Sequence, residues 1–150
     1  MGIDPFSTSY DTARERFRHA ATGAGARLAS HPQGDDGLTT DVATLGAAAP
    51  DWTVVVTSGL HGIEGFFGSA VQLAWLGSRA ILPDRGAVVL VHALNPYGFA
   101  HHRRVDADNV DLNRNFLPDD APRRTPPGCA PSRRPRRPAL SRPSSGPTMC

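Results

Sequence analysis

Two apolar runs rich in β-branched residues, with a longer apolar run between them, constrain the fold of this chain most strongly. Residues Thr53–Thr57 have the sequence Thr-Val-Val-Val-Thr, and Gly86–Leu94 form a second continuous apolar segment that ends before Asn-Pro. Short, bounded segments of this kind predict strands. Between them, Phe66–Leu76 is apolar nearly all round, which predicts a buried helix. A strand, a helix and a second strand are typical of a parallel βαβ unit, so the predicted fold class is α/β.

The residues before this unit predict one helix and one further strand. In residues 10–28, small and apolar side chains recur at the spacing of one helical face. The side chains of this face are Ala13, Phe17, Ala20, Ala21 and Ala24. Thr8 or Ser9 is the expected N-cap. A polar loop is expected around residues 31–37, and a short strand is expected at Thr40–Leu45.

The composition changes abruptly at Leu117. Residues 117–150 hold nine of the fourteen Pro residues and seven Arg against two Asp. Proline interrupts helices and sheets, and too little apolar surface remains to offset the entropy of ordering this segment. We therefore expect a domain over residues 7–116 and a disordered Arg/Pro-rich tail over residues 117–150. Residues 1–6 are typical of a vector-derived leader. The tail has the composition of a GC-rich gene translated out of frame, which suggests a frameshift after Phe116.

The composition also excludes several classes of protein. Every basic side chain other than His is Arg, and together with abundant Ala, Gly and Pro this indicates a GC-rich, bacterial gene. No run approaches the roughly 18–20 apolar residues of a membrane span, and no signal peptide is visible, so a cytoplasmic protein without a membrane partner is expected. Cys129 and Cys150 have no metal-binding spacing. The basic run Arg133–Arg137 lacks interleaved aromatic residues, so no nucleic-acid partner is expected.

A candidate metal site follows the first predicted strand. Residues 58–65 have the sequence Ser-Gly-Leu-His-Gly-Ile-Glu-Gly, and ligands bind beyond the carboxyl ends of strands in open α/β sheets. His61 and Glu64 carry an imidazole and a carboxylate, which are both good zinc ligands. Two residues of a glycine-flanked turn separate them, so both side chains can converge on one ion. The alternative is a loop histidine beside a solvated glutamate.

A candidate carboxylate-binding site follows the second predicted strand. The segment Asn95–Phe99 is followed by Arg103 and Arg104, and the sequence Val-Asp-Leu-Asn-Arg-Asn-Phe then contains Asn113 and Arg114. A guanidinium group can hold both oxygens of a carboxylate, and an amide beside it adds a donor. A second cation near a metal would stabilise the oxyanion that forms when water attacks a carbonyl group. The alternative is a hairpin-like loop with surface arginines.

Taken in order, these segments resemble the zinc carboxypeptidase family. The segments are His-x-x-Glu, Asn-Pro-x-Gly and Asp-x-Asn-Arg-Asn-Phe. The sequences of these motifs are most similar to those of a bacterial carboxypeptidase-like branch, near the succinylglutamate desuccinylases and aspartoacylases. The resemblance covers roughly residues 10–116 and implies the N-terminal part of a mixed sheet with flanking helices. It implies zinc as the cofactor, with His61 and Glu64 as two of its ligands.

The resemblance also implies roles around that metal. Arg104 would stabilise the oxyanion, with Arg103 as its alternative near the substrate. Asn113 and Arg114 would hold the carboxylate of the substrate, and Asp111 matches a supporting acid of the deacylases. The implied activity is a zinc-dependent hydrolase that cleaves an amide next to a free carboxylate, in a small peptide or an acyl amino acid.

The family pattern is incomplete in this chain. The family needs a third zinc ligand, a His, and a later Glu as general base, but no His follows His102 and no Glu follows Glu64. A catalytically incomplete fragment or pseudoenzyme is therefore the alternative to an active hydrolase. His92 is expected as a hydrogen-bonded core residue, and His101 and His102 are expected at the surface. Half a sheet would expose an unpaired edge, so self-association is expected.

Overall fold

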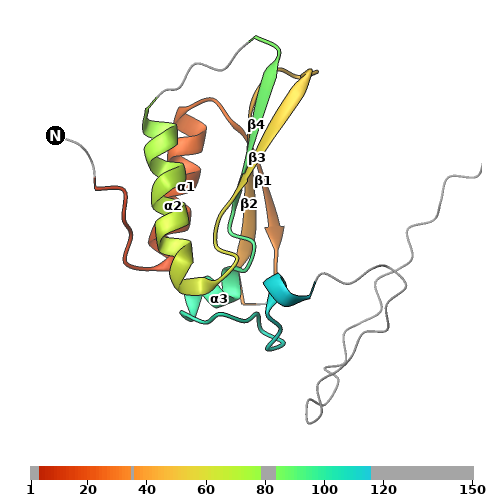
Figure 1. Ribbon diagram of the computed structural model, residues 1–150. Helices are drawn as coiled ribbons and strands as arrows, with labels where there is room; N and C mark the ends of the chain where they lie inside the picture. The colour runs from red at the N-terminus through yellow and green to blue at the C-terminus, as the bar shows by residue number, and fades with distance from the viewer. Residues whose placement is uncertain (1–3, 35, 79–83, 116–150) are drawn as a thin grey trace, which may run out of the picture.

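One mixed sheet of four strands carries two long helices on one of its faces (Figure 1). The structure, a computed structural model, describes residues 4–34, 36–78 and 84–115. In chain order its elements are α1 (Tyr10–Gly23), β1 (Arg27–Pro32), β2 (Thr39–Gly46), β3 (Trp52–Thr57), α2 (Gly62–Gly77), β4 (Gly86–His92), α3 (Pro96–Ala100) and the 3-10 helix η1 (Leu112–Arg114). The strand order is β1-β2-β4-β3. This architecture confirms the predicted α/β fold class.

The βαβ unit predicted from the apolar runs is present. Strands β3 and β4 pair in parallel, with Thr53 opposite Ala87 and Thr57 opposite Val91, and α2 connects them. Helix α2 is tied to both strands by Gln72, whose Nε2 donates to the carbonyl oxygens of Val56 and Val91, each at 3.2 Å. Strand β2 then pairs antiparallel with the other side of β4, and β1 pairs antiparallel with β2.

The main apolar core lies between the helices and the face of the sheet that they cover. It contains Phe17 and Ala21 of α1 and Leu76 of α2, which pack with Val88 and Leu90 of β4. On β2, alternate side chains turn toward the helices, as expected for a strand covered on one face. The helices therefore cover one face of the sheet, and the loops that carry the candidate site begin at the ends of its strands.

Three sequence predictions need correction. The first helix ends at Gly23 rather than at residue 28, because the chain leaves the helix at Ala24 and Gly25 has a φ of 79°. Residues 31 and 32 belong to β1 and not to a loop. Helix α2 is not buried all round, since Phe67 is 66% exposed. The expected cap was right, because the side chain of Ser9 accepts from Thr12 N.

Several predictions fall outside the described residues. The whole tail over residues 117–150 is among them, as are residues 1–3 of the expected leader. Within residues 4–34, 36–78 and 84–115, no helix has the length and apolar character that crossing a membrane requires.

Candidate active site

The site is built where the loops after β3 and β4 meet. Backbone hydrogen bonds join these loops: Leu94 N donates to Ser58 O at 2.9 Å, and Asn95 N donates to Gly59 O at 2.8 Å. A third bond, 2.9 Å long, runs from Gly62 N to Arg103 O. Because β3 and β4 are parallel, their carboxyl ends reach the same edge of the sheet, as expected for a ligand site in an open α/β fold.

His61 and Glu64 lie at the start of α2 and not in the expected turn. His61 occupies the N-cap position with extended backbone, and Glu64 is in the first helical turn. The approach of α3 to this turn requires a glycine, because a Cβ on Gly62 would collide with the backbone of Gly98 and Arg103. The helix start therefore fixes where the imidazole and the carboxylate stand, and an acidic group is stabilised by the helix dipole there.

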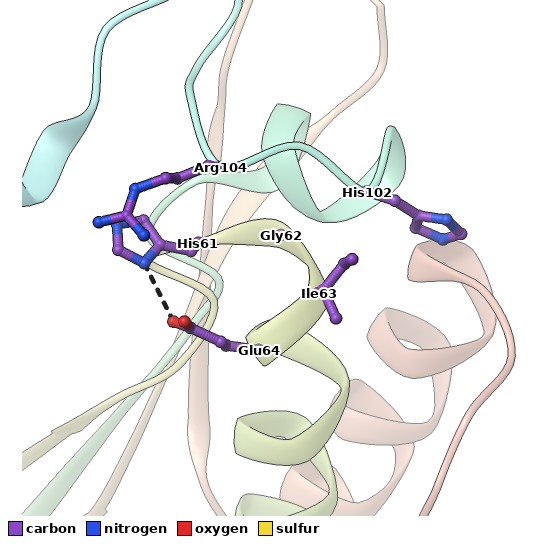
Figure 2. Close-up of a pocket in the computed structure, with 6 residues that line it drawn as sticks. All are labelled: His61, Gly62, Ile63, Glu64, His102 and Arg104. Carbon is purple, nitrogen blue, oxygen red and sulfur yellow. Dashed lines mark hydrogen bonds and ion pairs between the residues drawn. The ribbon is translucent and has the colours of Figure 1, made fainter.

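The imidazole of His61 lies between two carboxylates. Its Nδ1 is 3.0 Å from Oε2 of Glu64, the contact drawn as a dashed line in Figure 2. Its Nε2 is 3.1 Å from Oδ1 of Asp111, the residue that immediately precedes η1. The ring is only 9% exposed, whereas the Glu64 side chain is 72% exposed. One side of the ring is thus held inside the protein while the other faces an accessible carboxylate.

Asp111 is held as an anion by its neighbours. Arg104 Nε donates to Asp111 Oδ2 at 2.8 Å, and Asn113 N donates to Oδ1 at 3.0 Å. The hydrogen bond from Arg104 is the main cause that lowers the pKa of Asp111 to about 2, and the contact with His61 adds to it against the opposing effect of desolvation. The ionised Asp111 can only accept the hydrogen bond from Nε2–H of His61, and in the neutral imidazole this leaves the lone pair on Nδ1.

The donor set fits zinc with two protein ligands. Two ligands at zinc–ligand distances near 2.0–2.1 Å in a tetrahedron are about 3.3 Å apart, close to the 3.0 Å between Nδ1 of His61 and Oε2 of Glu64. A carboxylate on the far nitrogen, as Asp111 provides, commonly orients a metal-binding histidine. Among the described residues, no group of three or more His, Cys, Asp or Glu side chains could share one ion. Asp111 does not supply a third ligand because it is on the opposite side of the ring.

A small depression lies beside this pair. It has a volume of about 240 Å³ and is lined by His61, Gly62, Ile63, Glu64, His102 and Arg104 (Figure 2). The Arg104 side chain extends beside His61, while His102 lies beyond Ile63 on the other side. Arg104 uses Nε to hold Asp111, and its two terminal NH₂ groups make no hydrogen bond to any described residue. Within the described part of the chain they are therefore available to a ligand in the depression.

The other predicted substrate-binding residues are exposed and do not line the depression. Arg103 donates to Asn109 Oδ1 at 3.3 Å. Asn113 and Arg114 lie in η1, and the contact within this pair is a 3.4 Å bond from Arg114 Nη1 to Asn113 O. The structure thus brings η1 to the site through Asp111, without turning the Asn113–Arg114 pair into the depression.

The sequence prediction understated the contacts of one site residue, Asp111. The sequence marked it only as a supporting acid, yet it contacts both His61 and Arg104. The signal was its place in the Asp-x-Asn-Arg segment, two residues before Asn113.

His92, His101 and His102 occupy the positions expected for them. His92 is fully buried, its Nε2 is 2.9 Å from Ser69 Oγ, and its ring stacks on Phe17 with centroids 4.7 Å apart. His101 and His102 are exposed.

Comparison with known proteins gives one match. A family model described as a protein of unknown function, DUF2817, matches residues 6–129. No curated protein and no solved structure matches the chain.

Proposed function

The chain belongs to the DUF2817 family, and we propose that it carries the metal-binding part of a zinc-dependent hydrolase. The proposed reaction is hydrolysis of an amide next to a free carboxylate, in a small peptide or an acyl amino acid. The resemblance of its motifs to the bacterial carboxypeptidase-like branch of the zinc carboxypeptidases, near the succinylglutamate desuccinylases and aspartoacylases, supports this reaction class.

One observation carries the proposal. His61 presents Nδ1 to Glu64 at 3.0 Å while its other nitrogen is held by Asp111, an ionised carboxylate. A surface histidine that only caps a helix needs neither carboxylate. A metal-binding histidine holds the ion through one ring nitrogen, beside a second ligand. Its other ring nitrogen donates to an acceptor that orients the ring. The second nitrogen of His61 has such an acceptor, and the glutamate beside the first remains accessible.

Each residue of the site then has a chemical task. His61 and Glu64 would hold the zinc ion, which supplies a Lewis acid that polarises a carbonyl group. Arg104 offers its free NH₂ groups where negative charge develops on the carbonyl oxygen. Asp111 fixes both His61 and Arg104, so it positions the metal ligand and the cation relative to one another. Arg114 lies in η1 outside the depression, and only the motif resemblance supports it as the proposed partner of the substrate carboxylate.

A catalytically incomplete protein is the second candidate. It is favoured by the count of ligands, because the described residues give the metal two side chains where a catalytic zinc site usually has three. No Glu follows Glu64 in the sequence to serve as the general base of the family pattern. Such a protein would bind zinc and carboxylates without turnover.

Hydrolysis assays distinguish the two candidates. The full chain with zinc is incubated with N-acyl amino acids and short peptides, and with matched substrates whose carboxylate is blocked as an amide. A hydrolase of the proposed kind cleaves the amide only in substrates that have a free carboxylate. Its turnover stops when a chelator is added and recovers when zinc is restored. Turnover that survives the chelator, or that ignores the blocked carboxylate, would contradict the proposed reaction. Zinc binding without turnover supports the incomplete protein.

A variant tests the proposed carboxylate partner. Arg114→Ala should raise KM for free carboxylates about tenfold or more, because a charge-assisted bidentate contact is lost. Arg27→Ala removes an exposed arginine from β1 and serves as the matched control. An unchanged KM in Arg114→Ala would remove Arg114 from the site.

A further inference from the structure

Among residues 4–34, 36–78 and 84–115, strand β3 forms one edge of the sheet, and that edge is open. It pairs with β4 on one side, and no other described strand pairs with it. Its side chains are exposed on both faces: Val54, on the face of the helices, is 46% exposed, and Val55, on the opposite face, is 59% exposed. Edge strands of natural proteins are usually protected by lysine, proline or a bulge. Residues 52–57 contain no charge, no proline and no glycine.

The direction of the backbone leaves hydrogen-bonding groups at this open edge. Ser58 N donates to Val91 O in β4 at 3.0 Å. Successive residues of a strand turn their N–H and C=O groups to opposite sides. Val54 and Val56 therefore direct theirs to β4, while Thr53, Val55 and Thr57 direct theirs outward. A partner that satisfies these groups must itself present an extended backbone.

The strand is also complementary to itself. Its residues 53–57 have the palindromic sequence Thr-Val-Val-Val-Thr, centred on Val55. If two copies pair antiparallel about a two-fold axis at Val55, Thr53 lies opposite Thr57 and Val55 lies opposite Val55. Both Thr–Thr and Val–Val are favourable cross-strand pairs, and no like charges oppose each other. The outward-directed groups of Thr53, Val55 and Thr57 are the ones that such pairing uses.

We propose that β3 is a homodimerisation edge, on which a second copy of this chain adds its own β3 antiparallel to form a continuous eight-stranded sheet. A two-fold axis makes the contact isologous and closed, so pairing stops at two copies. The apolar side chains of Val54 and Val55 are covered on both faces by their counterparts. The proposal rests on the strand edge and does not depend on the zinc site.

Cysteine pairs test the register directly. In a chain whose Cys129 and Cys150 are replaced by Ser, Val55→Cys places two thiols opposite each other, with Cα atoms about 5.5 Å apart, which suits a disulfide. Mild oxidation should give a covalent dimer. Thr53→Cys alone should give none, because its two copies would be about 14 Å apart. A mixture of Thr53→Cys and Thr57→Cys chains should cross-link again. The proposal is overturned if all variants cross-link equally. It is also overturned if neither Val55→Cys nor the mixture cross-links.

Analytical ultracentrifugation provides an independent test. The wild-type chain should sediment as a dimer, and Val55→Lys should sediment as a monomer with an unchanged far-ultraviolet circular dichroism spectrum. The matched control is Phe67→Lys on the outer face of α2, where the side chain is 66% exposed, and this variant should remain dimeric. A monomeric wild type, or dimers lost in Phe67→Lys but kept in Val55→Lys, would overturn the proposal. If Val55→Lys fails to fold, the conservative cysteine variants decide.

Discussion

At the scale of single residues, Asp111 connects the two halves of the site. It accepts from Arg104 at 2.8 Å and contacts Nε2 of His61 at 3.1 Å. Asp111→Asn should weaken zinc binding about 10–100-fold, because a neutral amide holds the imidazole tautomer less firmly. The measurement is a zinc titration against a chromophoric chelator. Asp51→Asn, an exposed residue paired with Arg85, is the control and should bind as the wild type does. Equal affinity in both variants would contradict a positioning role for Asp111.

His92 makes stability depend on pH. Its burial lowers its pKa to about 4, an effect that Arg14 strengthens and Asp41 opposes, whereas the unfolded chain has the ordinary value of 6.5. Between these values the unfolded state binds more protons, so the folded state loses stability as pH falls from about 6.5 to 4. The loss amounts to about 2 kcal/mol between pH 7 and pH 5.

Urea unfolding of His92→Gln measures this contribution. The wild type should lose about 2 kcal/mol more than His92→Gln does between pH 7 and pH 5. His101→Gln, which removes an exposed imidazole, should keep the pH dependence of the wild type. Identical pH dependence in His92→Gln and wild type would contradict the buried, neutral imidazole.

Short sequence patterns predicted the burial of His92 and the proximity of His61 to Glu64, but not the partners that come from distant segments. An apolar run around His92 predicted a buried, hydrogen-bonded imidazole, and the structure confirms it with Ser69 as the partner. The three-residue spacing of His61 and Glu64 predicted that they could converge, and they are 3.0 Å apart. The contact with Asp111 spans fifty residues. It depends on how η1 returns to the site, which no short pattern encodes.

At the scale of elements, the packing of α2 against α3 depends on glycine. A Cβ on Gly62 would collide with the backbone oxygens of Gly98 and Arg103, and backbone cannot move aside as a flexible side chain can. Gly62→Ala should therefore lower the free energy of unfolding by about 2 kcal/mol or more. Gly77→Ala, at the other end of the same helix, has nothing within 4 Å of the new methyl group. It should raise stability by up to about 1 kcal/mol.

Thermal and urea unfolding of both variants check this prediction. A loss in Gly77→Ala equal to that in Gly62→Ala would contradict the prediction that the contact with α3 is what requires a glycine at position 62.

Most of the elements that the sequence predicted have a buried face, and β3 is the exception. Strands β2 and β4 and helix α2 were predicted and contribute buried side chains to the core beneath the helical layer. The largely exposed β3 was predicted from its run of β-branched residues. Strand β1 was missed, because most of its side chains are exposed and it therefore has no alternating apolar pattern. The same exposure explains why the first helix was predicted to continue into it.

At the scale of the whole molecule, the sheet determines where the candidate site lies. The parallel β3 and β4 bring the segments after them to one edge, where residues 58–64 and 94–104 are joined by backbone hydrogen bonds. The sequence predicted this location from the βαβ pattern alone. It did not predict the strand order β1-β2-β4-β3, because pairing across a sheet depends on contacts between distant segments.

Zinc titration of the full chain by calorimetry tests the central claim most directly, since every proposed task of the site depends on a metal between His61 and Glu64. The wild type should bind one zinc ion per chain. His61→Ala and Glu64→Ala should each weaken binding at least tenfold, while His101→Ala should leave it unchanged. A wild type that binds no zinc, or variants at His61 and Glu64 that bind it as tightly as His101→Ala does, would contradict the account.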